Sequence, residues 1–421
     1  MSVTEQFVVA DRVFDGDEVH SGMAVGIVGE RFSRTLPVAD VPAGAPMVRL
    51  EGATLAPGLI DANLHLAPWM VYGLIAAGVT TVRDVGNDVD AMIPLLDALP
   101  DGPRPTVHWS GPLMESTQVN WPTISKAHAS PGAIRATVDD LADRGLLAIK
   151  LYANATAELM AAASDQAHLR GMRVLGYLGA TNLDDAVAAG VDELQALAGC
   201  LASDLGEPDW ESAARRVAAA PVDHCPTLVV WHAFAHLGEP RAERDAAFAW
   251  VPPYTRAAWA TAHHASQPST DRVRRVRELV ERMAAIPTLR DADRRLLIGS
   301  DSPFPGLIPG FALHDEAGLL VESGFSALEA MRGLTSGNAD IIGLADVGRI
   351  VEGAPADLVA FRGDPTKRIA DISAVEAVWR AGQRVHLTDL AATAADVFRR
   401  PPTSPMDQLA DQRYIPATAT R

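Results

Sequence analysis

The sequence predicts an α/β protein in which a (β/α)8 TIM-like barrel carries a small β-sandwich built from both chain ends. Two observations lead to this fold class. Between about residues 56 and 340, short apolar runs alternate with alanine-rich helical stretches in about eight units, which is typical of parallel strands covered by helices. Outside this region, glycine and proline separate short β-type runs, as in small antiparallel sheets.

These patterns divide the chain into four segments. We expect residues 1–55 to form the first part of the sandwich, residues 56–340 the barrel and residues 341–386 the rest of the sandwich. Short strands cannot bury their faces alone, so the two sandwich parts need each other. Residues 232–290 form a mostly helical insertion that we expect to act as a lid over the barrel mouth. Residues 387–421 are expected to be a loosely ordered C-terminal extension.

Composition excludes several classes of protein. With 421 residues and 48% hydrophobic residues, the chain can bury a large core and is not disordered. The net charge of −17 disfavours nucleic acid and anionic membranes as partners. Two cysteines make no disulfide framework, no leader is recognisable, and no apolar run reaches the ~18 residues of a membrane helix. We therefore expect a cytoplasmic enzyme that binds a small molecule, with a homodimer left open.

Polar residues close several of the apolar runs. In (β/α)8 barrels the chemistry lies at the carboxyl ends of the strands. The residues at such ends are those from Asp61 to His65, then Asp84, Lys150, Tyr177 and Asp301. We expect these side chains to converge at the barrel mouth, with Asp84 in a structural role.

Several motifs resemble the amidohydrolase superfamily, in particular its imidazolonepropionase-like and prolidase-like branch. They include Ala-Pro-Gly-Leu-Ile-Asp-Ala-Asn-Leu-His-Leu at residues 56–66, Ala-Gly-Val-Thr-Thr-Val-Arg-Asp at 77–84 and Gly-Ser-Asp at 299–301. The resemblance covers about residues 5–385 in the order usual for the family. It implies a metal-bearing barrel joined to a sandwich made from both chain ends.

The family's binuclear metal centre is only partly matched. The resemblance implies a His-x-His pair after the first strand, a carboxylated lysine on the fourth, one histidine each on the fifth and sixth, and an aspartate on the eighth. Those positions hold Asn63 and His65, then Lys150, Tyr177, Ala196 and Asp301. Because zinc needs three or four donors, we predict a divergent enzyme with no metal and no other cofactor. One zinc ion, with Asn63 as a weak third donor, is the alternative.

The retained residues suggest acid–base chemistry. The first and eighth strands of a closed barrel are neighbours, so His65 and Asp301 are expected to form a His–carboxylate dyad. Lys150 and Tyr177 lie on neighbouring strands, and the ammonium is expected to lower the pKa of the phenol. These four are the predicted catalytic residues. The leading hypothesis is cyclisation, isomerisation or elimination in specialised metabolism.

The remaining candidates are predicted to bind substrate. Asn63 would hydrogen-bond it, while aromatic residues at strand ends and in loops would form an apolar pocket for a bulky molecule. The histidines and tryptophans in this set are Trp69, His108, Trp109, Trp121, His128, Trp231 and His232. Trp231 and His232 are expected to end a strand that begins at Leu228.

Two other functions stay open at this stage. One is a mononuclear metal-dependent hydrolase of amide, lactam or lactone bonds that uses His65, Asp301 and an unidentified donor. The other is a non-catalytic relative that binds a small molecule. Metal content, and whether water enters the product, distinguish the hydrolase from the metal-free enzyme.

Overall fold

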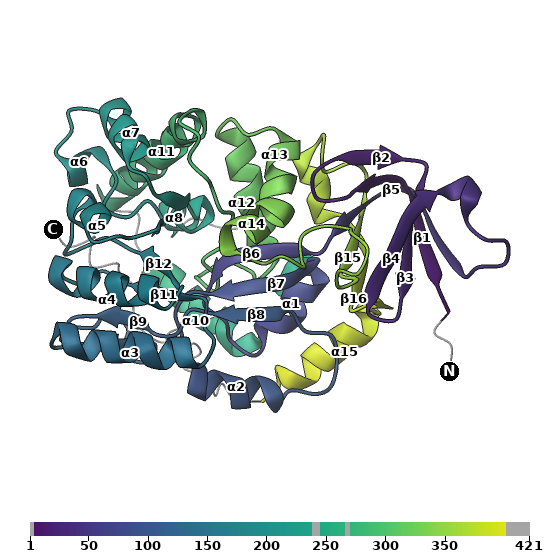
Figure 1. Cartoon of the computed structure of the whole chain (residues 1–421), viewed down its shortest axis with the longest axis horizontal. Helices are drawn as coiled ribbons and strands as arrows, with labels where there is room; N and C mark the ends of the chain where they lie inside the picture. The colour runs from purple at the N-terminus through teal and green to yellow at the C-terminus, as the bar shows by residue number, and fades with distance from the viewer. Residues whose placement is uncertain (1–3, 238–244, 266–269, 401–421) are drawn as a thin grey trace.

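A computed structural model describes residues 4–237, 245–265 and 270–400 of the chain. One end of the molecule is a large sheet, and the other is a body of parallel strands and helices (Figure 1). Within the described residues, no helix is both long and apolar enough to cross a membrane.

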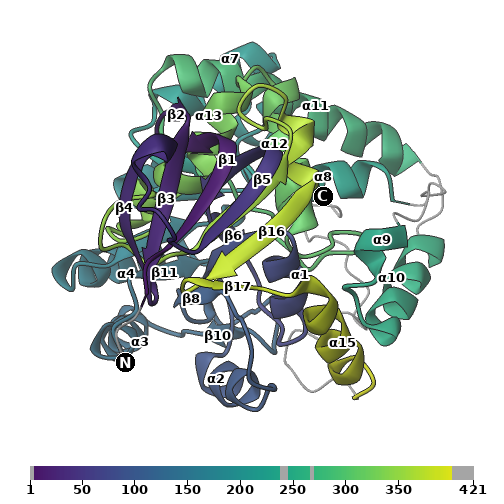
Figure 2. The same cartoon turned by 90° about the vertical axis from the view of Figure 1, so that its right-hand side faces the viewer.

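Strands from both chain ends form one eight-stranded sheet in the order β17-β16-β15-β5-β1-β3-β4, with β2 beside β1. The strands are β1 (Gln6–Phe14), β2 (Val19–Ser21), β3 (Met23–Val28), β4 (Arg31–Pro37), β5 (Met47–Pro57), β15 (Leu358–Arg362), β16 (Val375–Arg380) and β17 (Gln383–Arg384). β5 pairs with β1 in parallel and with β15 in antiparallel orientation. Figure 2 shows the purple N-terminal and yellow C-terminal strands side by side. The two ends are therefore hydrogen-bonded neighbours, whereas a two-layer sandwich stays a prediction.

The other strands pair in parallel and form a three-stranded and a six-stranded sheet. The first has the order β6-β7-β8, and the second β10-β9-β11-β12-β13-β14. Their bounds are β6 (Leu59–Leu64), β7 (Val79–Asp84), β8 (Thr106–Trp109), β9 (Leu113–Glu115), β10 (Ser125–Ala127), β11 (Ala148–Leu151), β12 (Arg173–Gly176), β13 (Glu193–Gln195) and β14 (Asp223–Cys225). Their buried residues are mainly apolar, as expected for strands covered on both faces.

Two stretches of chain connect these sheets. Residues 106–115 pair with β7 through β8 and with β11 through β9. Residues 296–302 run between β14 and β6, with bridges from Leu296 to His224 and from Ser302 to Leu64. Both links are what a (β/α)8 barrel requires, although closure of the barrel stays a prediction.

Helices alternate with the parallel strands along the chain (Figure 1). They are α1 (Met70–Ala76), α2 (Val89–Asp97), α3 (Pro131–Asp143), α4 (Ala157–Leu169), α5 (Leu183–Ala188), α6 (Ala202–Leu205), α7 (Trp210–Ala219), α8 (Leu228–Ala235), α9 (Asp245–Phe248), α10 (Pro253–Ala265), α11 (Thr270–Asp291), α12 (Phe311–Glu322), α13 (Ala327–Arg332), α14 (Asn338–Ile342) and α15 (Leu387–Val397). The long helices begin at side-chain caps. Ser130, for example, accepts a hydrogen bond from the backbone N–H of Ala133, and Pro131 opens α3.

Two expectations need correction. Residues 228–231 form the start of α8, not a strand, because a short apolar run fits a buried helix as well as a strand. The predicted extension begins with helix α15, whose neighbour Phe398 packs edge-on against Tyr72 of α1. Residues 401–421 of that extension lie outside the described residues, as do 238–244 and 266–269 of the predicted lid.

A buried ion pair joins β7 to β13. The Arg83 guanidinium donates to the Glu193 carboxylate, with Nη1 3.0 Å from Oε2, and Nε donates to the Ala62 carbonyl at 2.7 Å. The side chains are 3% and 0% exposed. In so dry a place each charge depends on its partner.

We predict that Arg83→Met lowers the free energy of unfolding by about 3–5 kcal/mol, because Glu193 is left as a buried charge without its main partner. Urea unfolding measures the change. Adding Glu193→Gln should recover part of it. The control is Arg135→Met, which removes an exposed ion pair with Asp165 and should cost less than about 1 kcal/mol. An equal effect of both single substitutions would contradict the prediction.

Candidate active site

His65 follows β6, and its ring orientation is set by the backbone. Its Nδ1 lies 2.9 Å from the carbonyl oxygen of Gly86. A carbonyl only accepts hydrogen bonds, so Nδ1 carries the hydrogen and donates it. Nε2 therefore points away from this contact and lies 3.5 Å from Oδ1 of Asp301. The structure brings the predicted pair together.

Close backbone contacts place Asp301 beside His65. The Asp301 N–H donates to the Asn63 carbonyl at 2.7 Å, and the His65 N–H donates to the Ser302 carbonyl at 2.8 Å. Asp301 has a φ of 52°, a left-handed conformation that is strained for a residue with a side chain. A Cβ added at Gly299 would lie 2.5 Å from Cβ of Asn63, so only glycine permits this approach.

The loop that holds His65 is itself fixed by Asp84. Its carboxylate accepts hydrogen bonds from the backbone N–H groups of Leu66 and Gly86, at 2.7 and 3.1 Å. A Cβ at Gly86 would lie 2.9 Å from Cε1 of His65, so glycine leaves room for the ring. These contacts agree with the structural role expected of Asp84.

Asn63 lies two residues before His65, so its side chain belongs to the same face of the extended chain. The residue is 1% exposed, and its Oδ1 accepts no hydrogen bond from a described residue. An acceptor buried in this way is costly unless a ligand completes it. Asn63 Oδ1 is therefore a free acceptor beside His65 and Asp301.

Lys150, on β11, is 2% exposed. Burial lowers the pKa of its ammonium to about 8, although the negative charges of Asp301 and Glu193 oppose the shift. Within the described residues, no carboxylate oxygen comes within 4.0 Å of Nζ, so Asp301 does not form the structural ion pair considered from the sequence. Amine and ammonium forms of Lys150 coexist near neutral pH.

The prediction that Lys150 lowers the pKa of Tyr177 is wrong. Burial raises the pKa of the Tyr177 phenol to about 12, and Asp301 adds to the rise. The nearest positive influence on the phenol is Arg282, which only partly opposes the shift. Tyr177 therefore keeps its proton and can donate a hydrogen bond, but it is no acid at neutral pH.

Sequence reasoning missed Tyr152. It lies two residues after Lys150, and this spacing could have indicated a shared face. Its ring packs against that of Tyr177, with centroids 4.7 Å apart, and its hydroxyl accepts a hydrogen bond from Nε1 of Trp121 at 3.2 Å. Burial raises the pKa of Tyr152 well above its ordinary value. Trp121 thus reaches the site through Tyr152.

The other predicted substrate-binding residues differ in their surroundings. Trp69 lies in the apolar core near α1. His108 and Trp109 end β8 and are half-buried, and burial with nearby Arg83 lowers the pKa of His108. His128 is buried between the Glu115 carbonyl and the Thr137 hydroxyl, contacts typical of a packing role.

The remaining two lie on α8. The Trp231 indole N–H donates to the carbonyl of Ala196 at 3.0 Å, which places Trp231 at the end of β13. The ring of His232 stacks on that of His236, with centroids 4.2 Å apart. Neither ends a strand, but Trp231 still reaches the strand ends.

Comparisons with known proteins identify the family. The sequence matches the amidohydrolase family over residues 54–385. The chain belongs to the amidohydrolase family. A comparison with curated proteins gave no match.

Solved structures share the amidohydrolase fold with this chain. Bottromycin amidohydrolase is 22% identical with a TM-score of 0.74, covering 96% of this chain and 92% of that one. A Xaa-Pro dipeptidase with bound methionine is 20% identical with a TM-score of 0.70, covering 91% and 100%. The A. niger ochratoxinase is 17% identical with a TM-score of 0.69, covering 91% and 96%. These neighbours imply a TIM-like barrel with an additional domain.

Family membership overturns the expectation that the enzyme needs no metal. Amidohydrolases such as prolidase are normally metal-dependent. Counting donors underestimated this dependence, because the count asked whether a binuclear centre survives and not whether a single ion does.

The donor set fits one cation and not two. Within the described residues, no group of three His, Cys, Asp or Glu side chains is arranged to hold a metal. However, the 3.5 Å between His65 Nε2 and Asp301 Oδ1 exceeds an ordinary charge-assisted hydrogen bond. It is close to the about 3.4 Å that separates two ligands of a tetrahedral zinc ion. The free Oδ1 of Asn63 supplies a third donor on the same face.

Glu316 of α12 is a second residue that the sequence gave no reason to select. It is fully buried; Oε2 accepts a hydrogen bond from the Val229 N–H at 2.6 Å, and Oε1 accepts none from a described residue. Burial raises the pKa of this carboxyl to about 8, and the charges of Asp61 and Asp301 add to the rise. Glu316 therefore holds a proton at neutral pH at the start of α8.

We predict that Glu316→Gln removes a pH-dependent loss of stability. The unfolded chain releases this proton near the ordinary pKa of 4.5, whereas the folded chain keeps it until about pH 8. Stability therefore falls as pH rises from about 4.5 to 8, by up to about 1.4 kcal/mol per pKa unit. Urea unfolding at pH 5, 6.5 and 8 measures it. If the variant kept the full wild-type decline, Glu316 would not be its source.

Proposed function

We propose that the protein is a metal-dependent hydrolase of an amide, lactam or lactone bond that uses one ion held by His65, Asp301 and Asn63. The observation that carries this proposal is the arrangement of His65 and Asp301. Nδ1 of His65 is committed to the Gly86 carbonyl, so a neutral ring directs the Nε2 lone pair at the Asp301 carboxylate. Two electron-rich atoms at this distance need a positive charge between them, and a metal ion supplies it.

Each residue has a distinct part in this site. A bound ion would polarise the substrate carbonyl and lower the pKa of a water molecule. The Gly86 carbonyl holds the His65 ring in one tautomer, as outer contacts of metal-binding histidines commonly do. The strained backbone at Asp301 keeps its carboxylate facing the ring. That carboxylate is the nearest group to take a proton from the attacking water.

The opposite side of the site offers hydrogen-bond donors. The Tyr177 and Tyr152 phenols stay protonated and lie together, so either hydroxyl can donate to an oxygen on which negative charge develops. Lys150, in its ammonium form, adds a positive charge in the same buried region. These groups would stabilise the tetrahedral oxyanion of acyl transfer.

Hydrolysis is preferred to cyclisation, isomerisation or elimination because the neighbouring structures belong to hydrolases. The aromatic side chains still favour a bulky organic substrate. Tyr152 and Tyr177 stack at one side, and Phe234 packs edge-on against Phe304, three residues after Asp301. Apolar walls of this kind exclude water and strengthen the polar contacts inside.

We predict that the purified protein binds about one equivalent of zinc, measured by mass spectrometry after dialysis, and hydrolyses members of a panel of N-acyl amino acids, lactams and lactones. His65→Gln and Asp301→Asn should each weaken zinc binding by at least about tenfold, because each removes a direct ligand. Hydrolysis should fall with metal content.

The matched control is His20→Gln, since His20 also contacts a carboxylate, that of Asp15, but lies in the terminal sheet. This variant should bind zinc and hydrolyse as the wild type does. Full activity after removal of all metal would overturn the metal-dependent proposal. Unchanged zinc affinity in both site variants would place the ion elsewhere.

A further inference from the structure

The search beyond these residues leads to Arg282 of α11. It is 3% exposed, and its guanidinium carbon lies 3.4 Å from the centroid of the Trp231 ring. Its Nε donates to the carbonyl of Ala196 at 3.0 Å, and Nη1 donates to the carbonyl of Glu278 at 3.0 Å. Trp231 donates to that same Ala196 carbonyl. The plane of the guanidinium is therefore fixed by two hydrogen bonds and one ring.

This buried cation has no carboxylate partner. Among the described residues, no carboxylate oxygen lies within the 4.0 Å of an ion pair, and Glu278 pairs with Arg274. Of the five N–H donors of a guanidinium, Nε and Nη1 use one each, which leaves three. A buried charge without a counter-ion is costly, and stacking on Trp231 offsets only part of that cost.

Arg282 also lies where the substrate must come. Ala196 directly follows β13, and Tyr177 directly follows β12, at the carboxyl ends of neighbouring strands. The charge of Arg282 is close enough to Tyr177 to lower the pKa of its phenol in part. Asp204 and Glu278 are the acidic side chains that influence Arg282 most, and neither reaches it.

We propose that Arg282, held flat by Trp231, is the subsite for a substrate carboxylate, so the substrate is a carboxylate-bearing amide such as an N-acyl amino acid or a lactam acid. The inference deepens the proposed function and rests on it for the scissile bond. The free edge of a guanidinium matches the two oxygens of a planar carboxylate in a bidentate pair. Such a pair supplies the missing counter-charge and orients the amide relative to His65 and Asp301.

The test compares two probes that differ only in charge, N-benzoylglycine and N-benzoylglycinamide. Calorimetry on the zinc-loaded full-length protein should show that the acid binds about 10- to 100-fold more tightly than the amide, the range for a charged hydrogen-bonded contact. Arg282→Gln should abolish this preference and leave amide binding unchanged. Arg282→Lys should retain part of it, because the charge stays but the fork is lost.

Arg277→Gln is the matched control, since Arg277 lies on the same helix but its side chain is 66% exposed. It should keep the full preference for the acid. If Arg282→Gln does not fold, as judged by circular dichroism, the wild type and Arg282→Lys still decide. Equal binding of acid and amide by the wild type, or a preference that survives Arg282→Gln, would overturn the subsite.

The same titrations with His65→Gln separate the two proposals. This variant should lose hydrolysis and zinc affinity but keep its preference for the acid, because Arg282 lies on a different element. If no panel member were hydrolysed and the acid were still preferred, the proposed function would fail and the subsite would stand.

Discussion

The backbone contacts between β6 and residues 298–302 determine where the two principal polar groups of the site meet. Asn63 and Ala62 each exchange a main-chain hydrogen bond with this segment, and Gly299 allows the chains to approach closely. His65 and Asp301 are far apart in the sequence, yet their relative position follows from these contacts. Asn63 contributes to the pairing through its carbonyl and to the site through its side chain. A shift in this register would separate imidazole, carboxylate and carboxamide at once.

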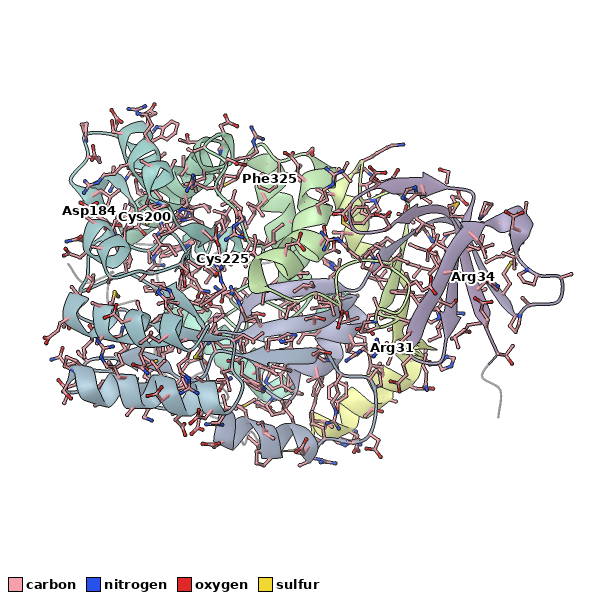
Figure 3. All side chains as sticks on the ribbon, viewed as in Figure 1. Arg31, Arg34, Asp184, Cys200, Cys225 and Phe325 are labelled. Atoms are coloured by element: carbon pink, nitrogen blue, oxygen red, sulfur yellow. The ribbon has the colours of Figure 1, made fainter. Side chains whose placement is uncertain are left out.

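Burial is the second influence on the site, and it acts in opposite directions on different groups. It holds Lys150 partly deprotonated, and it keeps protons on Tyr152, Tyr177 and Glu316. A dry interior disfavours whichever form carries charge. The same low polarity makes the Arg83–Glu193 pair dependent on both members, and it leaves Arg282 in need of an anion. The remaining cysteines follow this rule, since Cys200 and Cys225 are buried free thiols whose pKa values burial raises (Figure 3).

Local patterns in the sequence were sufficient for the parallel strands and for the segments that hold His65, Lys150 and Asp301. Periodicity failed at residues 228–231, where an apolar run that reads as a strand is a buried helix. The protonation of Tyr177 could not be predicted, because it depends on burial and not on the neighbouring strand. Arg282 and Glu316 were missed since each comes from a helix distant in sequence, and no motif marks them. The absence of two histidines was read too strongly, because it excludes a pair of ions but not a single one.

The terminal sheet has a consequence for how the chain is made. β1 to β5 leave the ribosome early, but their partner β15 follows only after the whole catalytic body; Thr54, for example, donates to a carbonyl 309 residues further on. Until then, β5 presents an unpaired edge of the kind that recruits other chains. Pairing at such sequence separation is slow, so the nascent N-terminal segment depends on chaperones or on rapid completion of translation to stay monomeric.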